Sequence, residues 1–118
     1  MNKKIIMLLG AGPEQAEAIE TAKNLNLKVI AVDDDPNAPG LKIADIGIAA
    51  DIKDVNKMVK IGKKYEIDGV MTHAVEIPQI VAKVAQKLNL PGIDPEIAER
   101  ANILAKVDFP IFSGPEKI

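Results

Sequence analysis

KIIMLLGAGPEQ, residues 4–15, is the stretch that decides the fold. The continuous apolar run over residues 4–9 is typical of a strand buried on both faces of a sheet. Gly10-Ala11-Gly12-Pro13 ends this run, and Pro13 suits the first position of a helix, where its missing N–H costs nothing. The stretch therefore predicts a buried strand, a tight glycine-rich turn and a helix that runs to about residue 25.

The same alternation of apolar strands and amphipathic helices continues along the chain. Strands are predicted at residues 27–32, 46–49 and 68–72, and the second of these follows a loop that contains Pro36, Pro39 and Gly40. Further helices are expected where capping and first-turn residues precede an apolar period. Asp51 or Asp54 caps one, Pro78 opens another, and Asp94-Pro95 opens a last helix that ends near residue 104.

Repeated strand–helix units with right-handed crossovers leave few topologies open. We expect an α/β protein with a Rossmann-like, three-layer, doubly wound parallel sheet in the strand order 3-2-1-4. A short fifth strand is expected at residues 90–93. Residues 1–105 form this domain in the prediction. Residues 106–118 contain prolines and show no sustained period, so they are expected to be an irregular C-terminal tail.

Composition excludes several classes of function. The 118 residues suit one domain, and 15 Lys and Arg residues against 17 Asp and Glu residues argue against a basic surface for nucleic acid. The absence of cysteine and the single histidine, His73, exclude thiol catalysis and metal sites built from cysteines or several imidazoles. The apolar run near the N-terminus is too short for a signal peptide or a membrane span, so we expect a cytoplasmic protein.

Ligands of doubly wound sheets bind beyond the carboxyl ends of the strands, where the strand order reverses. In the loop at residues 10–15, Gly10 and Gly12 would let an anion approach the open N–H groups of a helix N-terminus. Gln15 stands where a dinucleotide-binding turn has its third glycine, and Glu14 would repel a phosphate. The turn therefore predicts a site for an anion or polar ligand, and a tight turn without a ligand is the alternative.

Two further loops reach the same edge of the predicted sheet, at residues 33–40 and 72–76. Asp33 ends a strand about twenty residues after the glycine turn, where dinucleotide folds place a carboxylate for a ribose. A solvated acidic turn is the alternative for Asp33 and its neighbours. Thr72 ends the fourth strand, and Glu76 either caps the next helix or faces a ligand. No catalytic triad, P-loop lysine or metal-binding set is found, so no catalytic or metal-binding residue is predicted.

Four segments in this order resemble a known family: LGAGPEQ at residues 9–15, VIAVDDDPNAPG at 29–40, Ala44-Asp45, and LNLPG at 88–92. They are similar to the preATP-grasp, or biotin-carboxylase N-terminal-like, domain of ATP-grasp ligases. Carbamoyl-phosphate synthase large subunits and purine-pathway enzymes carry such domains. The resemblance covers residues 3–102. It departs from the family after Asn102, where Ile103 replaces the usual lysine.

The resemblance implies a substrate-binding domain of, or split from, an ATP-dependent carbon–nitrogen ligase. The ATP-grasp fold of such enzymes supplies ATP and Mg binding and phosphoryl transfer, so this chain is expected to bind no cofactor and to be inactive alone. A carboxylate, phosphate or amine substrate would be held at the positions that match the family's motifs: Gly10, Gly12, Gln15, Asp33 and Glu76. Thr72, at the end of the fourth strand, is a further candidate for binding the substrate.

The expected partners are a small-molecule substrate, an ATP-grasp domain or chain, and a second copy in a homodimer, with no nucleic acid and no membrane. Two other functions stay open at this point. One is a nucleotide- or NAD-binding Rossmann module, against which the residue Gln15 argues. The other is a stand-alone scaffold with no specific ligand.

Overall fold

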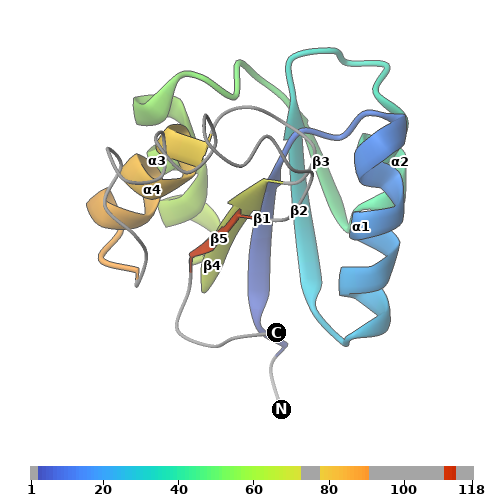
Figure 1. Cartoon of the computed structure of the whole chain (residues 1–118), viewed down its shortest axis with the longest axis horizontal. Helices are drawn as coiled ribbons and strands as arrows, with labels where there is room; N and C mark the ends of the chain where they lie inside the picture. The colour runs from blue at the N-terminus through green and yellow to red at the C-terminus, as the bar shows by residue number, and fades with distance from the viewer. Residues whose placement is uncertain (1–2, 73–77, 91–110, 114–118) are drawn as a thin grey trace, which may run out of the picture.

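The computed structural model describes residues 3–72, 78–90 and 111–113. A five-stranded sheet in the order β3-β2-β1-β4-β5 forms the middle layer (Figure 1). Strands β1 to β4 pair in parallel, and this confirms the α/β class and the predicted order 3-2-1-4. The strands are β1 (Ile5–Leu9), β2 (Lys28–Asp33), β3 (Ile46–Ala49), β4 (Gly69–Thr72) and β5 (Ile111–Ser113).

Helices cover both faces of the sheet, as a doubly wound fold requires (Figure 1). Helices α1 and α2 pack on one face, and α3 and α4 pack on the other. Among the described residues, no helix is long and apolar enough to cross a membrane. The helices are α1 (Pro13–Asn24), α2 (Pro39–Ile43), α3 (Val55–Tyr65) and α4 (Pro78–Lys87).

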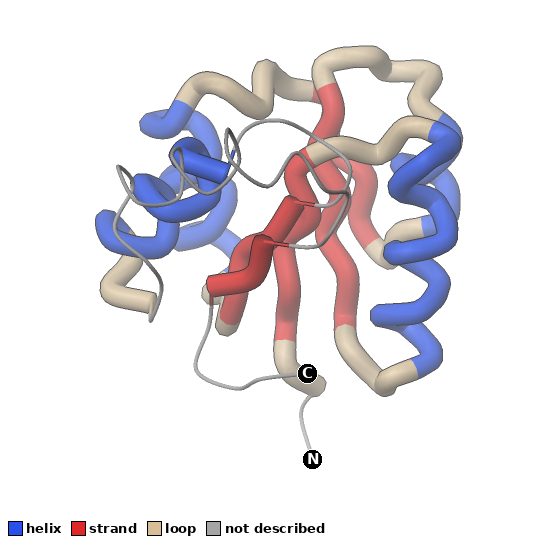
Figure 2. The backbone as a smooth tube through the Cα atoms, in the orientation of Figure 1, coloured by secondary structure: helices blue, strands red, loops and turns tan. Residues whose placement is uncertain are grey.

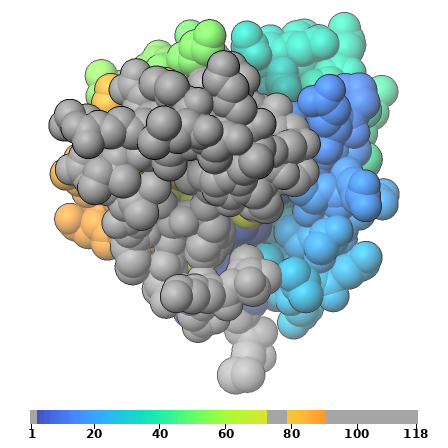
Figure 3. Space-filling view, viewed as in Figure 1, coloured from blue at the N-terminus to red at the C-terminus, as the bar shows by residue number. Residues whose placement is uncertain are grey.

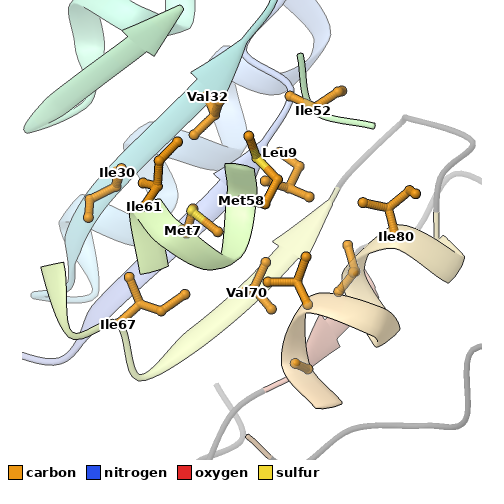
Figure 4. Close-up of a cluster of buried hydrophobic side chains, with 13 residues drawn as sticks. Met7, Leu9, Ile30, Val32, Ile52, Met58, Ile61, Ile67, Val70 and Ile80 are labelled. Atoms are coloured by element: carbon orange, nitrogen blue, oxygen red, sulfur yellow. The ribbon is translucent and has the colours of Figure 1, made fainter. Parts of the chain in front are cut away.

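Strand β1 supplies both hydrophobic cores, because successive side chains of a strand point to opposite faces. Ile6 and Leu8 join the core under α1, whereas Met7 and Leu9 join the core under α3 and α4 (Figure 4). All four side chains are at most 2% exposed. The apolar run is therefore buried on both sides, as the sequence predicted.

A side-chain cap fixes where α3 begins. Asp54 is the N-cap, and its carboxylate accepts a hydrogen bond from the Lys57 N–H at 3.1 Å. Asp51, the other candidate, instead accepts from the Lys53 N–H within the preceding turn. The structure thus assigns the cap to Asp54.

Two elements differ from the sequence prediction. Residues 39–43, expected in an irregular connection, form the short helix α2, with Pro39 in its first turn. The strand beside β4 is Ile111–Ser113, which lies in the expected tail and runs antiparallel to β4. Leu90 belongs to no strand, and residues 91–93 lie outside the described residues. Three residues are too few to show a period in the sequence, yet their backbone can pair with the outer edge of β4.

The predicted helix at residues 94–104 and the predicted domain boundary at residue 105 also lie outside the described residues, as do His73 and Glu76. The division into a domain and a tail therefore stays a prediction.

Candidate functional site

The candidate site lies at the carboxyl edge of the sheet, where β1, β2 and β4 end side by side. Leu9 is in register with Val32 on one side and with Thr72 on the other. The turn that follows β1 therefore emerges between the ends of its two neighbours. The loop after β2 reaches the same end of the sheet (Figure 2).

Gly10 shapes the turn. Its φ of 104° lies in a region that side chains rarely adopt, so a glycine is needed there. Its N–H donates to the Val32 carbonyl at 2.7 Å, which continues the β1–β2 pairing by one residue. This N–H group is therefore used within the fold, and Gly10 contributes conformation rather than a free donor.

Ala11 is held on one side by the last residue of β2 and on the other by the loop that follows it. Its N–H donates to Oδ2 of Asp33 at 2.8 Å, and its carbonyl accepts from the Gly40 N–H at 2.7 Å. Oδ1 of Asp33 accepts from the Asp35 N–H at 2.9 Å. Ala11 is fully buried. One carboxylate thus joins the glycine-rich turn to the neighbouring loop.

Gly12 is the N-cap of α1, and its carbonyl accepts from the N–H groups of Gln15 and Ala16 at 3.0 and 3.1 Å. Pro13 has no N–H to offer. Within the described part of the chain, the N–H groups of Gly12 and Glu14 therefore remain as donors without a partner. Donors at the start of a helix suit an oxygen atom that carries negative charge.

The Gln15 side chain covers the turn. It is only 7% exposed, and its Oε1 lies 2.9 Å from the point where a Cβ on Gly12 would be. Helix α1 thus folds the Gln15 amide back over the glycine. The amide occupies the place where a dinucleotide-binding turn has a glycine with no side chain at all.

Thr72 lies in the core beneath the turn and does not line the site. It is 1% exposed, and its Oγ1 donates to the Leu9 carbonyl at 3.0 Å. This bond ties the end of β4 to the end of β1, just before the turn. The hydroxyl proton of Thr72 is therefore already used.

Five of the six residues singled out by the sequence come together at this edge: Gly10, Gly12, Gln15, Asp33 and Thr72. Glu76 lies outside the described residues. Sequence reasoning placed the loop at residues 33–40 at this edge but missed the roles of Ala11 and Gly40. In the space-filling view the surface of α1 meets that of the segment around residue 40 (Figure 3). No group of three acidic or histidine side chains in the described ranges could hold a metal.

A central glycine-rich turn in a 3-2-1-4 sheet defines the class of the protein as a Rossmann-like α/β domain. The chain belongs to the family described as PylC-like, N-terminal domain, whose model matches residues 6–95. This confirms the resemblance that the sequence motifs indicated.

Curated and solved relatives agree with this assignment. The formate-dependent phosphoribosylglycinamide formyltransferase of Prochlorococcus marinus (strain MIT 9515) is 34% identical over 92 residues, which are 78% of this chain and 23% of that protein. The chain thus spans about a quarter of the length of the curated relatives it matches.

The crystal structure of phosphoribosylglycinamide synthetase from Anaerococcus prevotii matches with a TM-score of 0.68 and 30% identity, over 90% of this chain and 26% of that one. N5-carboxyaminoimidazole ribonucleotide synthetase from Thermotoga maritima matches with a TM-score of 0.66 and 22% identity, over 87% and 29% of the two chains. The second likeness shows the fold alone.

Proposed function

We propose that this chain is the substrate-binding N-terminal part of an ATP-dependent carbon–nitrogen ligase of the ATP-grasp type. The family match over residues 6–95 carries the proposal, and the open donors of the glycine-rich turn support it. ATP, Mg and phosphoryl transfer would come from an ATP-grasp domain or a separate chain. By itself the chain binds its substrate and does not convert it. We place it in the cytoplasm. A homodimer is a further prediction, which sedimentation of the chain would test.

We infer that the substrate is phosphoribosylglycinamide or a close analogue. Two relatives with different activities, a formyltransferase and a synthetase, are both named for this molecule. It offers a carbonyl oxygen and an amine at one end and a phosphate at the other. The exposed carboxylate of Glu14 lies on the first turn of α1 and would repel the phosphate. The glycinamide end therefore suits this turn better.

In this proposal the site residues divide by role. The Gly12 N–H and the Gln15 amide donate to the carbonyl oxygen of the substrate. The Glu76 carboxylate accepts a hydrogen bond from its amine. Gly10 and Thr72 shape the turn from within, and Asp33 lies beside it. The positions proposed to bind substrate, directly or by shaping the turn, are Gly10, Gly12, Gln15, Asp33, Thr72 and Glu76.

Thermal melting with a panel of ligands tests the proposal. Phosphoribosylglycinamide should raise the melting temperature, because a ligand that binds only the folded state stabilises it by mass action. ATP with Mg and NAD should leave it unchanged. A response to NAD alone would favour a dinucleotide-binding module, and no response to any ligand would favour a scaffold. Either result would contradict the proposal.

The variant Gly12→Val locates the binding site. A side chain at this position meets Oε1 of Gln15 at 2.9 Å from its Cβ, so it displaces the amide and crowds the turn. We expect binding to be abolished while the circular dichroism of the sheet is kept. Thr21→Val on the exposed face of the same helix is the matched control and should bind normally. Binding that survives Gly12→Val would place the site elsewhere.

A further inference from the structure

The end of β2 and the loop that follows it hold the Ala11–Gly12 peptide, whose N–H is one of the donors that the turn offers to a ligand. We infer that Asp33 and Gly40 are positioning residues, which fix the Ala11–Gly12 peptide and so direct the Gly12 N–H toward the substrate. This inference rests on the proposed function, because it explains how the same site is prepared for its ligand.

Peptide geometry makes the connection. The Ala11 carbonyl and the Gly12 N–H belong to one planar unit, so fixing the oxygen also fixes the direction of the N–H. The Gly40 N–H donates to that oxygen at 2.7 Å. A hydrogen bond accepted at the carbonyl also polarises the N–H of the same unit and strengthens it as a donor.

Close packing leaves this peptide no alternative position. Ala11 is fully buried. A Cβ on Gly40 would lie 2.7 Å from the Ala11 oxygen and 2.9 Å from the Ala11 Cβ, so only glycine permits this approach. The neighbouring loop therefore lies directly against the turn and limits how the peptide can rotate.

Asp33 connects the two loops from the other side of Ala11. Oδ2 accepts from the Ala11 N–H, and Oδ1 accepts from the Asp35 N–H. Asp35 in turn accepts from the N–H groups of Asn37 and Ala38, at 2.9 and 3.0 Å, on the way to Gly40. Because each oxygen of this carboxylate binds a backbone N–H, we assign it the role of holding the turn, in place of the ribose contact of dinucleotide folds.

Asp33→Asn tests the inference, with Asp68→Asn as its matched control. Asparagine keeps the shape of the side chain, but its NH2 group cannot accept the bond that one carboxylate oxygen accepts. Asp68 uses the same kind of bond at the opposite edge of the sheet, where its Oδ2 accepts from the Ile5 N–H at 2.8 Å. Asp68→Asn can keep this one bond through its amide oxygen and therefore reports the effect of removing a charge far from the site.

The readouts are amide hydrogen exchange by NMR and titration with phosphoribosylglycinamide and with glycinamide. Asp33→Asn should speed exchange at Ala11 and weaken both ligands by about tenfold, as the loss of one charged hydrogen bond implies. Asp68→Asn should leave exchange at Ala11 and both affinities unchanged. An equal loss of affinity for the two ligands indicates that the turn, which both ligands contact, has changed.

Other outcomes overturn the inference. If Asp33→Asn weakens only phosphoribosylglycinamide and leaves exchange at Ala11 unchanged, Asp33 contacts the ribose directly. If the two asparagine variants behave alike, Asp33 has no special role. If the wild-type chain binds neither ligand, the proposed function fails, and exchange at Ala11 alone decides whether Asp33 holds the turn.

Discussion

The two edges of the sheet use the same hydrogen bond for different purposes. At the amino edge, the carboxylates of Asp45 and Asp68 accept from the N–H groups of Val29 and Ile5, and each bond joins neighbouring strands near their starts. At the carboxyl edge, the Asp33 carboxylate accepts from two loops. A bond between strands adds to stability alone, whereas a bond between loops also sets the shape of a site.

Backbone conformation separates the two edges in a second way. Helices α1 and α3 lead to the amino edge through the left-handed residues Asn26 and Glu66, with φ of 65° and 53°. The carboxyl edge instead uses Gly10, with φ of 104°, and Gly40. A left-handed turn alone tolerates a side chain at some cost, but close contact between two backbones does not.

The largest effect is expected for Gly40→Ala. Its Cβ would lie 2.6 Å from Cδ1 of Ile19 and 2.7 Å from the Ala11 oxygen, and the backbone atom cannot move aside as a side chain can. We expect the free energy of unfolding to fall by about 3 kcal/mol, at the upper end for overpacking, and ligand binding to weaken. Urea denaturation measures the first and titration the second.

Gly12→Ala is the control for Gly40→Ala, since its Cβ meets only the flexible end of Gln15. It should reduce the free energy of unfolding by less than about 1 kcal/mol, the usual cost of alanine at an N-cap. If the two variants lose the same amount of stability, the close contact between Gly40 and Ala11 is not what excludes a side chain at position 40.

The next largest effect is expected for Gly10→Ala. A φ of 104° is strained for any residue with a Cβ, and we expect a loss of roughly 2 kcal/mol in the free energy of unfolding. Binding should weaken as well, because the turn would relax away from its present shape. A variant that unfolds at the same urea concentration as the wild type would show that the turn adapts without strain.

The sequence predicted the fold well because the apolar runs of the strands and the helical spacing of apolar residues in the helices were both clear. Strand β3 and the start of α1 fall where they were expected, and Asp54 was one of two candidate caps. The short elements α2 and β5 were not predicted, since neither is long enough to show a period. Their positions depend on tertiary pairing, which a single sequence does not display.

The candidate site was predicted in place but not in detail. The sequence indicated that Gly10 and Gly12 would both help to hold the ligand, yet the Gly10 N–H donates to the Val32 carbonyl. That pairing depends on how far the ladder between two strands continues, and no local motif encodes it. The contact between Gly40 and Ala11 likewise joins segments that are distant in the sequence.

A smaller effect is expected for Asp45→Ala at the amino edge. The variant leaves the N–H of the buried residue Val29 without the partner it has at 2.7 Å. The free energy of unfolding should fall by about 1 kcal/mol, the usual value for one hydrogen bond. Ligand affinity, measured by titration, should not change. Weaker binding in this variant would contradict the idea that hydrogen bonds at the amino edge affect stability but not the site at the carboxyl edge.

The smallest effect, and the one of opposite sign, is expected for Glu66→Gly. Glu66 is the C-cap of α3 in the left-handed conformation, which glycine adopts without strain. Its negative charge also lies at the carboxyl end of a helix, where it is unfavourable. We expect the free energy of unfolding to rise by about 0.5 to 1 kcal/mol, because relief of strain exceeds the greater entropy of glycine in the unfolded chain. Glu66→Gln removes the charge alone and should give only a fraction of this gain. Ligand affinity should be unchanged in both variants, because strain at the amino edge can be relieved without changing the site at the carboxyl edge.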